Sequence, residues 1–121
     1  MVTVLLVDDD RIILELFTVV LEKLGGFRVL RAADGQTAIK TASQYRGDID
    51  LLLSDIVMPG DLSGVQVAEI LEECRPKMKV LLMSGCNISE RMSSYDCHGW
   101  KFLPKPFSPA ALLSKIQEIL G

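Results

Sequence analysis

Short apolar runs alternate with longer amphipathic stretches five times along this chain. The runs lie at residues 2–7, 28–31, 51–54, 80–83 and 102–103. Four of them are apolar on successive positions, whereas a strand with one solvent-facing side would alternate apolar and polar residues. Strands that are buried on both faces are typical of a parallel sheet covered by helices. The pattern therefore predicts an α/β sandwich whose parallel strands are joined by right-handed crossovers.

The stretches between the runs carry helix start signals and apolar stripes. Three candidate caps precede them: Asp10, Ser63 (with Gln66 at capping-box spacing) and Ser108 (followed by Pro109). The second helix is expected to start at Asp34. In the first helix six apolar residues, expected to face the sheet, precede Gly25-Gly26: Ile13, Leu16, Phe17, Val20, Leu21 and Leu24. The other stripes are Ala38, Ile39 and Ala42; Val67, Ile70 and Leu71; and Leu112, Leu113, Ile116, Ile119 and Leu120. A further helix within residues 89–97 has the weakest pattern.

Composition narrows the class of protein. With 121 residues, 49% of them hydrophobic and 24% charged, the chain is expected to fold as one domain over residues 1–121, without an output domain. The net charge of −3 and the absence of a lysine and arginine cluster argue against direct nucleic-acid binding. No apolar run is long enough to span a membrane, and we expect no secretory leader, because no charged start precedes an apolar core. Three cysteines, an odd number without metal-ligand spacing, favour reduced thiols, buried or at the surface, and hence a cytoplasmic location.

Charged and hydroxyl side chains stand where the predicted strands end. Asp8 and Asp9 follow the first run, Asp55 the third and Lys105 the fifth, while Ser84 ends the fourth. In an open parallel sheet, such positions converge on one crevice. Neighbouring carboxylates need a compensating cation, and oxygen ligands with spare coordination suit Mg²⁺ together with a phosphate. Asp55 is then the best candidate for a nucleophile that forms an acyl phosphate, with Lys105 and Ser84 contacting the phosphoryl oxygens.

Four ordered motifs carry a family resemblance. VLLVDDD (residues 4–10), DIVMPGDLSG (55–64), LLMSG (81–85) and FLPKPF (102–107) resemble the receiver domain of two-component response regulators. The match covers essentially the whole chain. It implies a single-domain, flavodoxin-like (βα)5 fold in three layers, with a parallel five-stranded sheet in the order 2-1-3-4-5.

The resemblance also implies roles for individual residues. Asp55 would be the phosphoacceptor, and Mg²⁺ would be held by Asp8, Asp9, Asp55 and the backbone carbonyl of Val57. Ser84 and Lys105 would contact the phosphoryl group. Ser84 and Phe102 would form the switch, and the bond between Lys105 and Pro106 would be cis.

The implied partners are those of a signalling module rather than of an enzyme with a separate substrate. A sensor histidine kinase or histidine phosphotransfer protein would donate the phosphoryl group. The face formed by the fourth helix, fifth strand and fifth helix would signal to a downstream protein or a fused output domain. The receiver would be a monomer or a phosphorylation-linked dimer.

The chain departs from the common pattern in three places. The loop at residues 60–64 is one residue longer than usual, as in receivers attached to hybrid sensor kinases, whereas Met1 directly before the first strand favours an N-terminal receiver or a stand-alone protein. Ser84 stands where threonine is frequent, which removes the methyl group that restricts the rotamer. Phe102 replaces the tyrosine of some members and so lacks a phenolic hydrogen bond.

Plainer interpretations stay open beside these. The residues Asp8 to Asp10 could be a charge cluster at a helix start, Lys105 a solvated surface lysine, Ser84 a strand end and Phe102 a core residue. His98 is expected at the surface. As a whole the chain could be a phosphorylation-independent interaction module or, less favoured, an aspartyl-phosphate phosphohydrolase; Val57 cannot supply the second acid/base carboxylate that such a hydrolase needs. Neither Val57 nor Cys86 suits the orientation of an attacking water, so we expect slow self-dephosphorylation.

Overall fold

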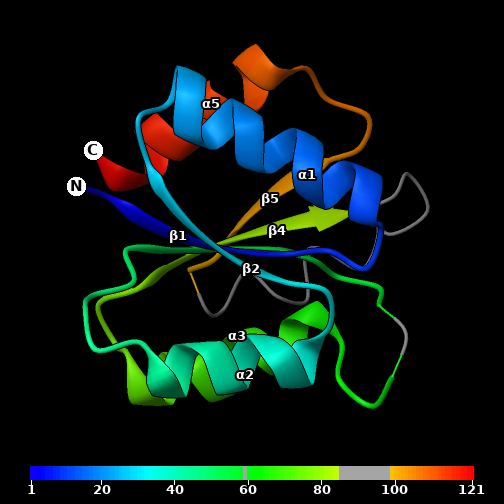
Figure 1. The fold of residues 1–121 in the computed structure, drawn as a ribbon, viewed down its shortest axis with the longest axis vertical. Helices are drawn as coiled ribbons and strands as arrows, with labels where there is room; N and C mark the ends of the chain where they lie inside the picture. The colour runs from blue at the N-terminus through cyan, green and yellow to red at the C-terminus, as the bar shows by residue number, and fades with distance from the viewer. Residues whose placement is uncertain (59, 85–98) are drawn as a thin grey trace.

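The sheet has five parallel strands, as the apolar runs predict. The computed structural model describes residues 1–58, 60–84 and 99–121. Its strands are β1 (Thr3–Val7), β2 (Arg28–Ala32), β3 (Leu51–Asp55), β4 (Lys79–Ser84) and β5 (Lys101–Pro104). They lie in the order β2-β1-β3-β4-β5, and every neighbouring pair is parallel (Figure 1). The order that the resemblance implies is confirmed.

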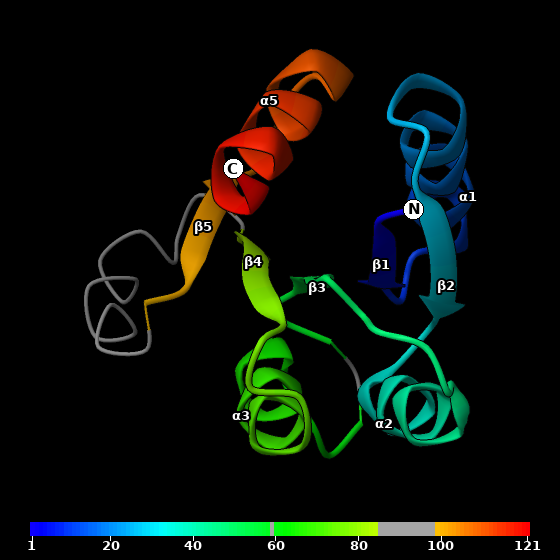
Figure 2. The same cartoon turned by 90° about the vertical axis from the view of Figure 1, so that its left-hand side faces the viewer.

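Helices cover both faces of this sheet. Helix α1 (Arg11–Val19) continues into a π-helical turn, η1 (Val20–Leu24), and is followed by α2 (Gly35–Gln44), α3 (Gly64–Cys74) and α5 (Pro109–Leu120). Figure 2 shows α1 and α5 on one face and α2 and α3 on the other. The result is the three-layer flavodoxin-like arrangement. The helix expected within residues 89–97 lies outside the described residues, as do Cys86, Cys97 and His98.

Successive residues of the central strands enter two different cores. Leu5 and Val7 pack in the cluster between the sheet and helices α2 and α3, whereas Val4 and Leu6 pack in the cluster toward α1 and α5. All four side chains are fully buried. Burial on both sides is why the runs show no alternation of apolar and polar residues.

The caps predicted at Asp10, Ser63 and Ser108 begin their helices, and Asp34, predicted only as a helix start, is a cap as well. Asp10 accepts a hydrogen bond from the Ile12 amide at 3.0 Å, and Asp34 from the Thr37 amide at 2.7 Å. Ser63 and Gln66 form a reciprocal capping box, with Ser63 Oγ accepting at 3.2 Å and Gln66 Oε1 at 2.9 Å. Ser108 Oγ accepts from the Ala111 amide at 3.0 Å. These local hydrogen bonds fix where each helix leaves its strand, and thus the rim of the crevice.

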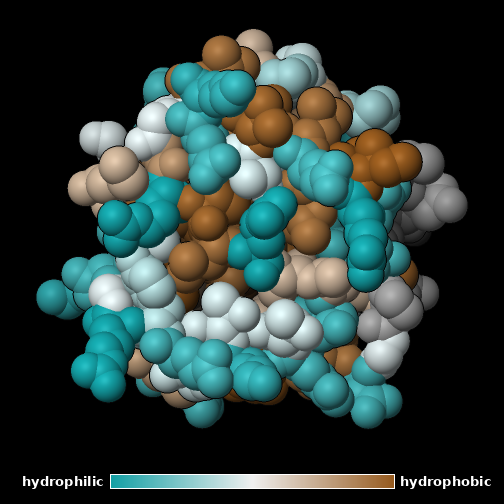
Figure 3. All heavy atoms as spheres, in the orientation of Figure 1, coloured by the Kyte–Doolittle hydropathy of each residue, from teal (hydrophilic) through white to brown (hydrophobic). Residues whose placement is uncertain are grey.

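The apolar stripe of the first helix is only partly buried. Phe17, Val20 and Leu21 are buried, but Leu16 is 49% exposed and Leu24 69%, so the prediction that they face the sheet is wrong. Leu16 lies at the edge of the stripe, and the π-helical turn moves Leu24 off the line of an α-helix. Figure 3 shows apolar side chains at the surface above α1.

One smaller expectation also fails. Ile70 of α3 is 39% exposed although Leu71, the next residue, is buried, so Ile70 lies on the side of the helix that faces away from the core. Cys74, at the end of the same helix, is an exposed free cysteine, one of the two expected states. Among the described residues, no helix has the length and apolar character needed to cross a membrane.

Candidate functional site

The predicted site residues come together at the carboxyl edge of the sheet. Asp8 directly follows β1, and Asp55 and Ser84 are the last residues of β3 and β4. Lys105 follows β5, and its amide donates a hydrogen bond to the Ser84 carbonyl oxygen at 2.7 Å. Parallel register brings these strand ends to one edge, because Ser54 pairs with Val7 and Asp55 with Met83. The predicted convergence is confirmed.

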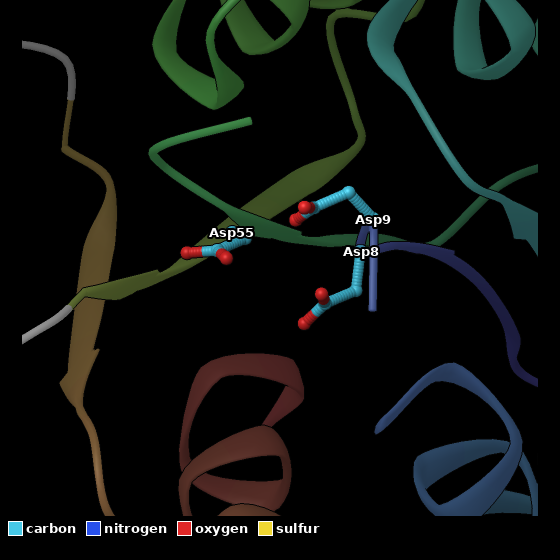
Figure 4. Close-up of side chains that lie close together, drawn as sticks. All are labelled: Asp8, Asp9 and Asp55. Carbon is cyan, nitrogen blue, oxygen red and sulfur yellow. The ribbon is translucent and has the colours of Figure 1, made fainter. Parts of the chain in front are cut away.

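Three carboxylates form the centre of this edge. One oxygen from each of Asp8, Asp9 and Asp55 lies within 4.8 Å of the others. Asp8 is buried at 1% exposure, Asp55 is half-buried and Asp9 is exposed. Figure 4 shows the three side chains grouped beyond the ends of β1 and β3. The cluster therefore has a buried side and an open side.

Lys105 is shared between two of these carboxylates. Its Nζ lies 3.3 Å from Asp55 Oδ2 and 3.5 Å from Asp8 Oδ2. The side chain keeps 31% exposure, so the ammonium stays accessible from solvent. The bond between Lys105 and Pro106 is cis, as the resemblance implies. Lys105 is thus ion-paired with the carboxylate cluster and is not a free surface lysine.

Burial and three neighbouring charges shift the pKa of Asp55, and only the charge of Lys105 opposes the others. The pKa of Asp55 is raised above its ordinary value of 3.8, first because burial disfavours the charged form. The nearby Lys105 ammonium lowers that pKa, whereas the charges of Asp8 and Asp9 raise it further. The site therefore holds more negative charge than its own lysine compensates.

Asp8 shows where a cation fits. Its Oδ1 accepts a hydrogen bond from the Asp10 amide at 2.9 Å. Its Oδ2 is buried and accepts no hydrogen bond from the described residues, although the Lys105 ammonium faces it at 3.5 Å. A buried anionic oxygen is costly unless cations compensate it, and Lys105 is shared with Asp55. A hard cation such as Mg²⁺, which prefers carboxylate and carbonyl oxygens, suits this set of donors.

The remaining predicted residues differ in how far they are buried. Ser84 is buried at 1% exposure, and Phe102 is partly buried against the core on the side of α2 and α3. The Val57 side chain, two residues past Asp55, is 64% exposed. The Phe102 ring thus lies at the edge of this core and is partly exposed to solvent.

The sequence patterns do not reveal that Gly64 shapes the backbone at this edge. Gly64, the first residue of α3, is buried, and its amide donates to the Ile56 carbonyl oxygen at 2.8 Å. A Cβ built on Gly64 would collide with the carbonyl oxygen of Asp55. The sequence shows Gly64 only as the last letter of a motif, because this contact joins backbones nine positions apart.

Comparison with known proteins identifies the class. The model of the response regulator receiver domain matches residues 4–117 of this chain. The chain is 32% identical to the transcriptional regulatory protein CpxR of Escherichia coli over 117 residues, which are 97% of this chain and 48% of CpxR. It therefore spans about half the length of that curated relative.

Solved structures agree. The chemotaxis protein CheY4 of Vibrio cholerae superposes with a TM-score of 0.87 at 28% identity, covering 99% of each chain. The receiver domain of the hybrid histidine kinase CckA gives a TM-score of 0.81 at 28% identity, covering 98% of this chain and 99% of that one. Fold, site and family model together place this chain in the response regulator receiver family. Domains of this family serve as phosphoacceptors and interact with histidine kinases.

Proposed function

We propose that this receiver accepts a phosphoryl group on Asp55 from the phosphohistidine of a partner protein, in a step that requires Mg²⁺. The observation that supports this most is the sharing of Lys105 Nζ between Asp55 Oδ2 at 3.3 Å and Asp8 Oδ2 at 3.5 Å. One ammonium cannot balance the three clustered carboxylates, which leaves negative charge for a second cation to compensate.

The transfer itself is a displacement at phosphorus. A carboxylate oxygen of Asp55 attacks, the bond from phosphorus to the donor's imidazole nitrogen breaks, and the electron pair of that bond returns to the imidazole. The ionised form of Asp55 is the nucleophile, and the neighbouring Lys105 favours it over the protonated form. The same ammonium is within reach of the transferred oxygens and can offset their charge.

Asp8, Asp9, Asp55 and the carbonyl of Val57 would hold Mg²⁺. When bound, the ion neutralises charge on the transferring phosphoryl oxygens. Asp9, exposed, lies on the open side from which a hydrated ion can enter. Asp8 is held through its Oδ1 by the Asp10 amide, and its buried Oδ2 lies 3.5 Å from Lys105 Nζ. The buried Asp8 would thus be a carboxylate ligand with a fixed orientation. The exposed Asp9 would give the ion access to the site from solvent.

The phosphoryl group would then act as a switch. The Ser84 hydroxyl would move toward it, and Phe102, now at the edge of the core, would turn further inward. The face that includes β5 and α5 would carry the signal. To reverse a 1:99 bias between two states, a ligand must favour one of them by about 5.5 kcal/mol.

The wider setting is part of the same proposal. A sensor histidine kinase or a histidine phosphotransfer protein is the donor, the receiver catalyses only its own phosphorylation and dephosphorylation, and the setting is cytoplasmic. A downstream protein or a fused output domain receives the signal. A phosphorylation-independent interaction module is the alternative, and the paired Asp55 and Lys105 count against it because such a module has no need of them.

The test uses a small-molecule donor, so that no kinase has to be known. Wild type and Asp55→Asn are incubated with acetyl phosphate, with Mg²⁺ or with EDTA, and their intact masses are measured. We expect one added phosphoryl group in the wild type with Mg²⁺, and none in EDTA or in Asp55→Asn. An unmodified wild type under all conditions would favour the interaction module. Equal modification of Asp55→Asn would show that another residue is the acceptor.

A further inference from the structure

The start of helix α3 lies directly against the backbone of the proposed acceptor. The Gly64 amide donates a hydrogen bond to the Ile56 carbonyl oxygen at 2.8 Å. A Cβ on Gly64 would collide with the Asp55 carbonyl oxygen, and would lie 2.9 Å from the Asp55 carbonyl carbon and 3.0 Å from Ile56 Cα. Every one of these neighbours is backbone, which cannot rotate away as a side chain can.

The conformation of Gly64 does not by itself require glycine. Gly64 is a helical residue and is not among the glycines with positive φ, which are Gly26, Gly60, Gly99 and Gly121 among the described residues. The requirement is therefore one of space: glycine permits the helix to approach the end of β3. A larger residue would have to push α3 away or displace the backbone at Asp55 and Ile56.

The other side of that backbone is also held. The Ile56 amide donates to the Met83 carbonyl oxygen of β4 at 3.0 Å. Asp55 and Ile56 are thus fixed between β4 and the first turn of α3, which the capping box of Ser63 and Gln66 fixes in turn. Rigid support of this kind is what keeps a ligand side chain in its productive geometry.

We propose that Gly64 is a positioning residue for Asp55: the contact between the start of α3 and the end of β3 sets where the Asp55 carboxylate stands relative to Asp8 and Asp9. This inference rests on the proposed function, because the geometry it protects is that of the Mg²⁺ and phosphoryl site. The inference adds that the first residue of α3 supports the backbone that carries Asp55.

The test separates positioning from general stability. Gly64→Ala is compared with Gly47→Ala, in the loop before β3, where the atoms nearest to a Cβ, the first at 2.8 Å, belong to the movable Tyr45 side chain. Ile116→Ala, a truncation of a fully buried residue of α5, serves as a destabilised control. Mg²⁺ dissociation constants are measured by calorimetry on unphosphorylated protein, at a temperature where each variant is folded.

We expect Gly64→Ala to weaken Mg²⁺ binding by roughly 10–100-fold, the usual cost of losing the support of a metal ligand. Gly47→Ala and Ile116→Ala should stay close to the wild type. Amide hydrogen exchange supplies a readout that needs no metal: in Gly64→Ala the Ile56 amide should exchange faster by more than the change in global stability accounts for. A Gly64→Ala variant with wild-type Mg²⁺ affinity and unchanged Ile56 protection would overturn the inference.

A second variant and a readout that needs no metal cover two other outcomes. If Gly64→Ala does not fold, Ser63→Ala replaces it, since this change removes the cap at 3.2 Å and loosens the same turn without adding an atom. We expect the same two effects, smaller in size, and their absence would equally overturn the inference. If the wild type binds no Mg²⁺, the proposed function fails, whereas the exchange of the Ile56 amide still decides the role of Gly64.

Discussion

Replacing Asp55 by asparagine should stabilise the metal-free protein although it removes the proposed acceptor. The folded state raises the pKa of Asp55 from 3.8, chiefly through burial. The native state therefore binds this proton more tightly than the unfolded chain does. By linkage, the free energy of unfolding falls as pH rises from 3.8 through the raised pKa, and the loss persists at neutral pH. Asparagine, which does not ionise, avoids it.

The pairwise charges give the size of the effect. At 4.8 Å, the upper limit for the separation of the clustered oxygens, two unit charges repel by about 3.5 kcal/mol at an effective dielectric constant of about 20. The attraction between Lys105 and Asp55 at 3.3 Å is about 5 kcal/mol on the same scale. Asp8 repels the Asp55 charge by about that first amount, and the exposed Asp9 adds a smaller, solvent-screened repulsion. Together they nearly cancel the attraction by Lys105. What remains is the cost of burying the Asp55 charge, so we expect a gain on the order of 1 kcal/mol.

Urea unfolding followed by circular dichroism measures this gain at neutral pH, in EDTA and with Mg²⁺. Asp55→Asn should unfold at higher urea than the wild type in EDTA, and the difference should vanish as pH falls toward 3.8. Saturating Mg²⁺ should stabilise the wild type, by about 2.7 kcal/mol at one hundred times the dissociation constant, and Asp55→Asn much less. Asp48→Asn, an exposed aspartate before β3, is the matched control and should change little. A loss of stability for Asp55→Asn in EDTA would refute the reasoning, because the pairing with Lys105 would then outweigh burial.

Three other substitutions test separate parts of the account. Lys105→Met should slow phosphorylation by acetyl phosphate at least about tenfold, because the positive charge beside the transferred oxygens is lost; a wild-type rate would exclude this role. Val57→Asn should shorten the half-life of the phosphorylated protein, since an amide beside the acceptor can orient water, and a half-life no shorter than that of the wild type would contradict the expected slow dephosphorylation. Arg75→Ala removes three hydrogen bonds of 2.7–2.9 Å to carbonyls of residues 42, 45 and 47, so urea unfolding should show a loss of about 2–3 kcal/mol. The phosphorylation rate of Arg75→Ala should be unchanged, because these contacts lie at the opposite end of β3 from Asp55.

The parts of the fold that depend on neighbouring residues in the chain could be predicted from the sequence. Strand burial follows from unbroken apolar runs, and the capping box of Ser63 and Gln66 follows from their spacing. The meeting of Asp8, Asp55 and Lys105 could also be predicted, because parallel strands bring their carboxyl ends to one edge. The strand order came from the family resemblance, since no run of residues encodes which strands are neighbours.

Features that arise from packing between distant segments could not be predicted. The stripe of the first helix gives no sign of where α1 stops facing the sheet, so the exposure of Leu16 and Leu24 appears only in three dimensions. The sequence equally gives no sign that the buried Oδ2 of Asp8 accepts no hydrogen bond, because this depends on how the surrounding groups are placed in three dimensions. The contact of Gly64 with the Asp55 backbone depends on how closely α3 approaches β3.

The most direct test of the central claim is to identify the residue that carries the phosphoryl group. The protein is phosphorylated with acetyl phosphate and Mg²⁺, reduced with borohydride, which converts an aspartyl phosphate to homoserine, and digested for peptide sequencing by mass spectrometry. The account predicts homoserine at position 55 only, and none when Mg²⁺ is withheld. Homoserine at position 8 or 9, or a stable phosphate on Ser84 with Asp55 intact, would contradict it.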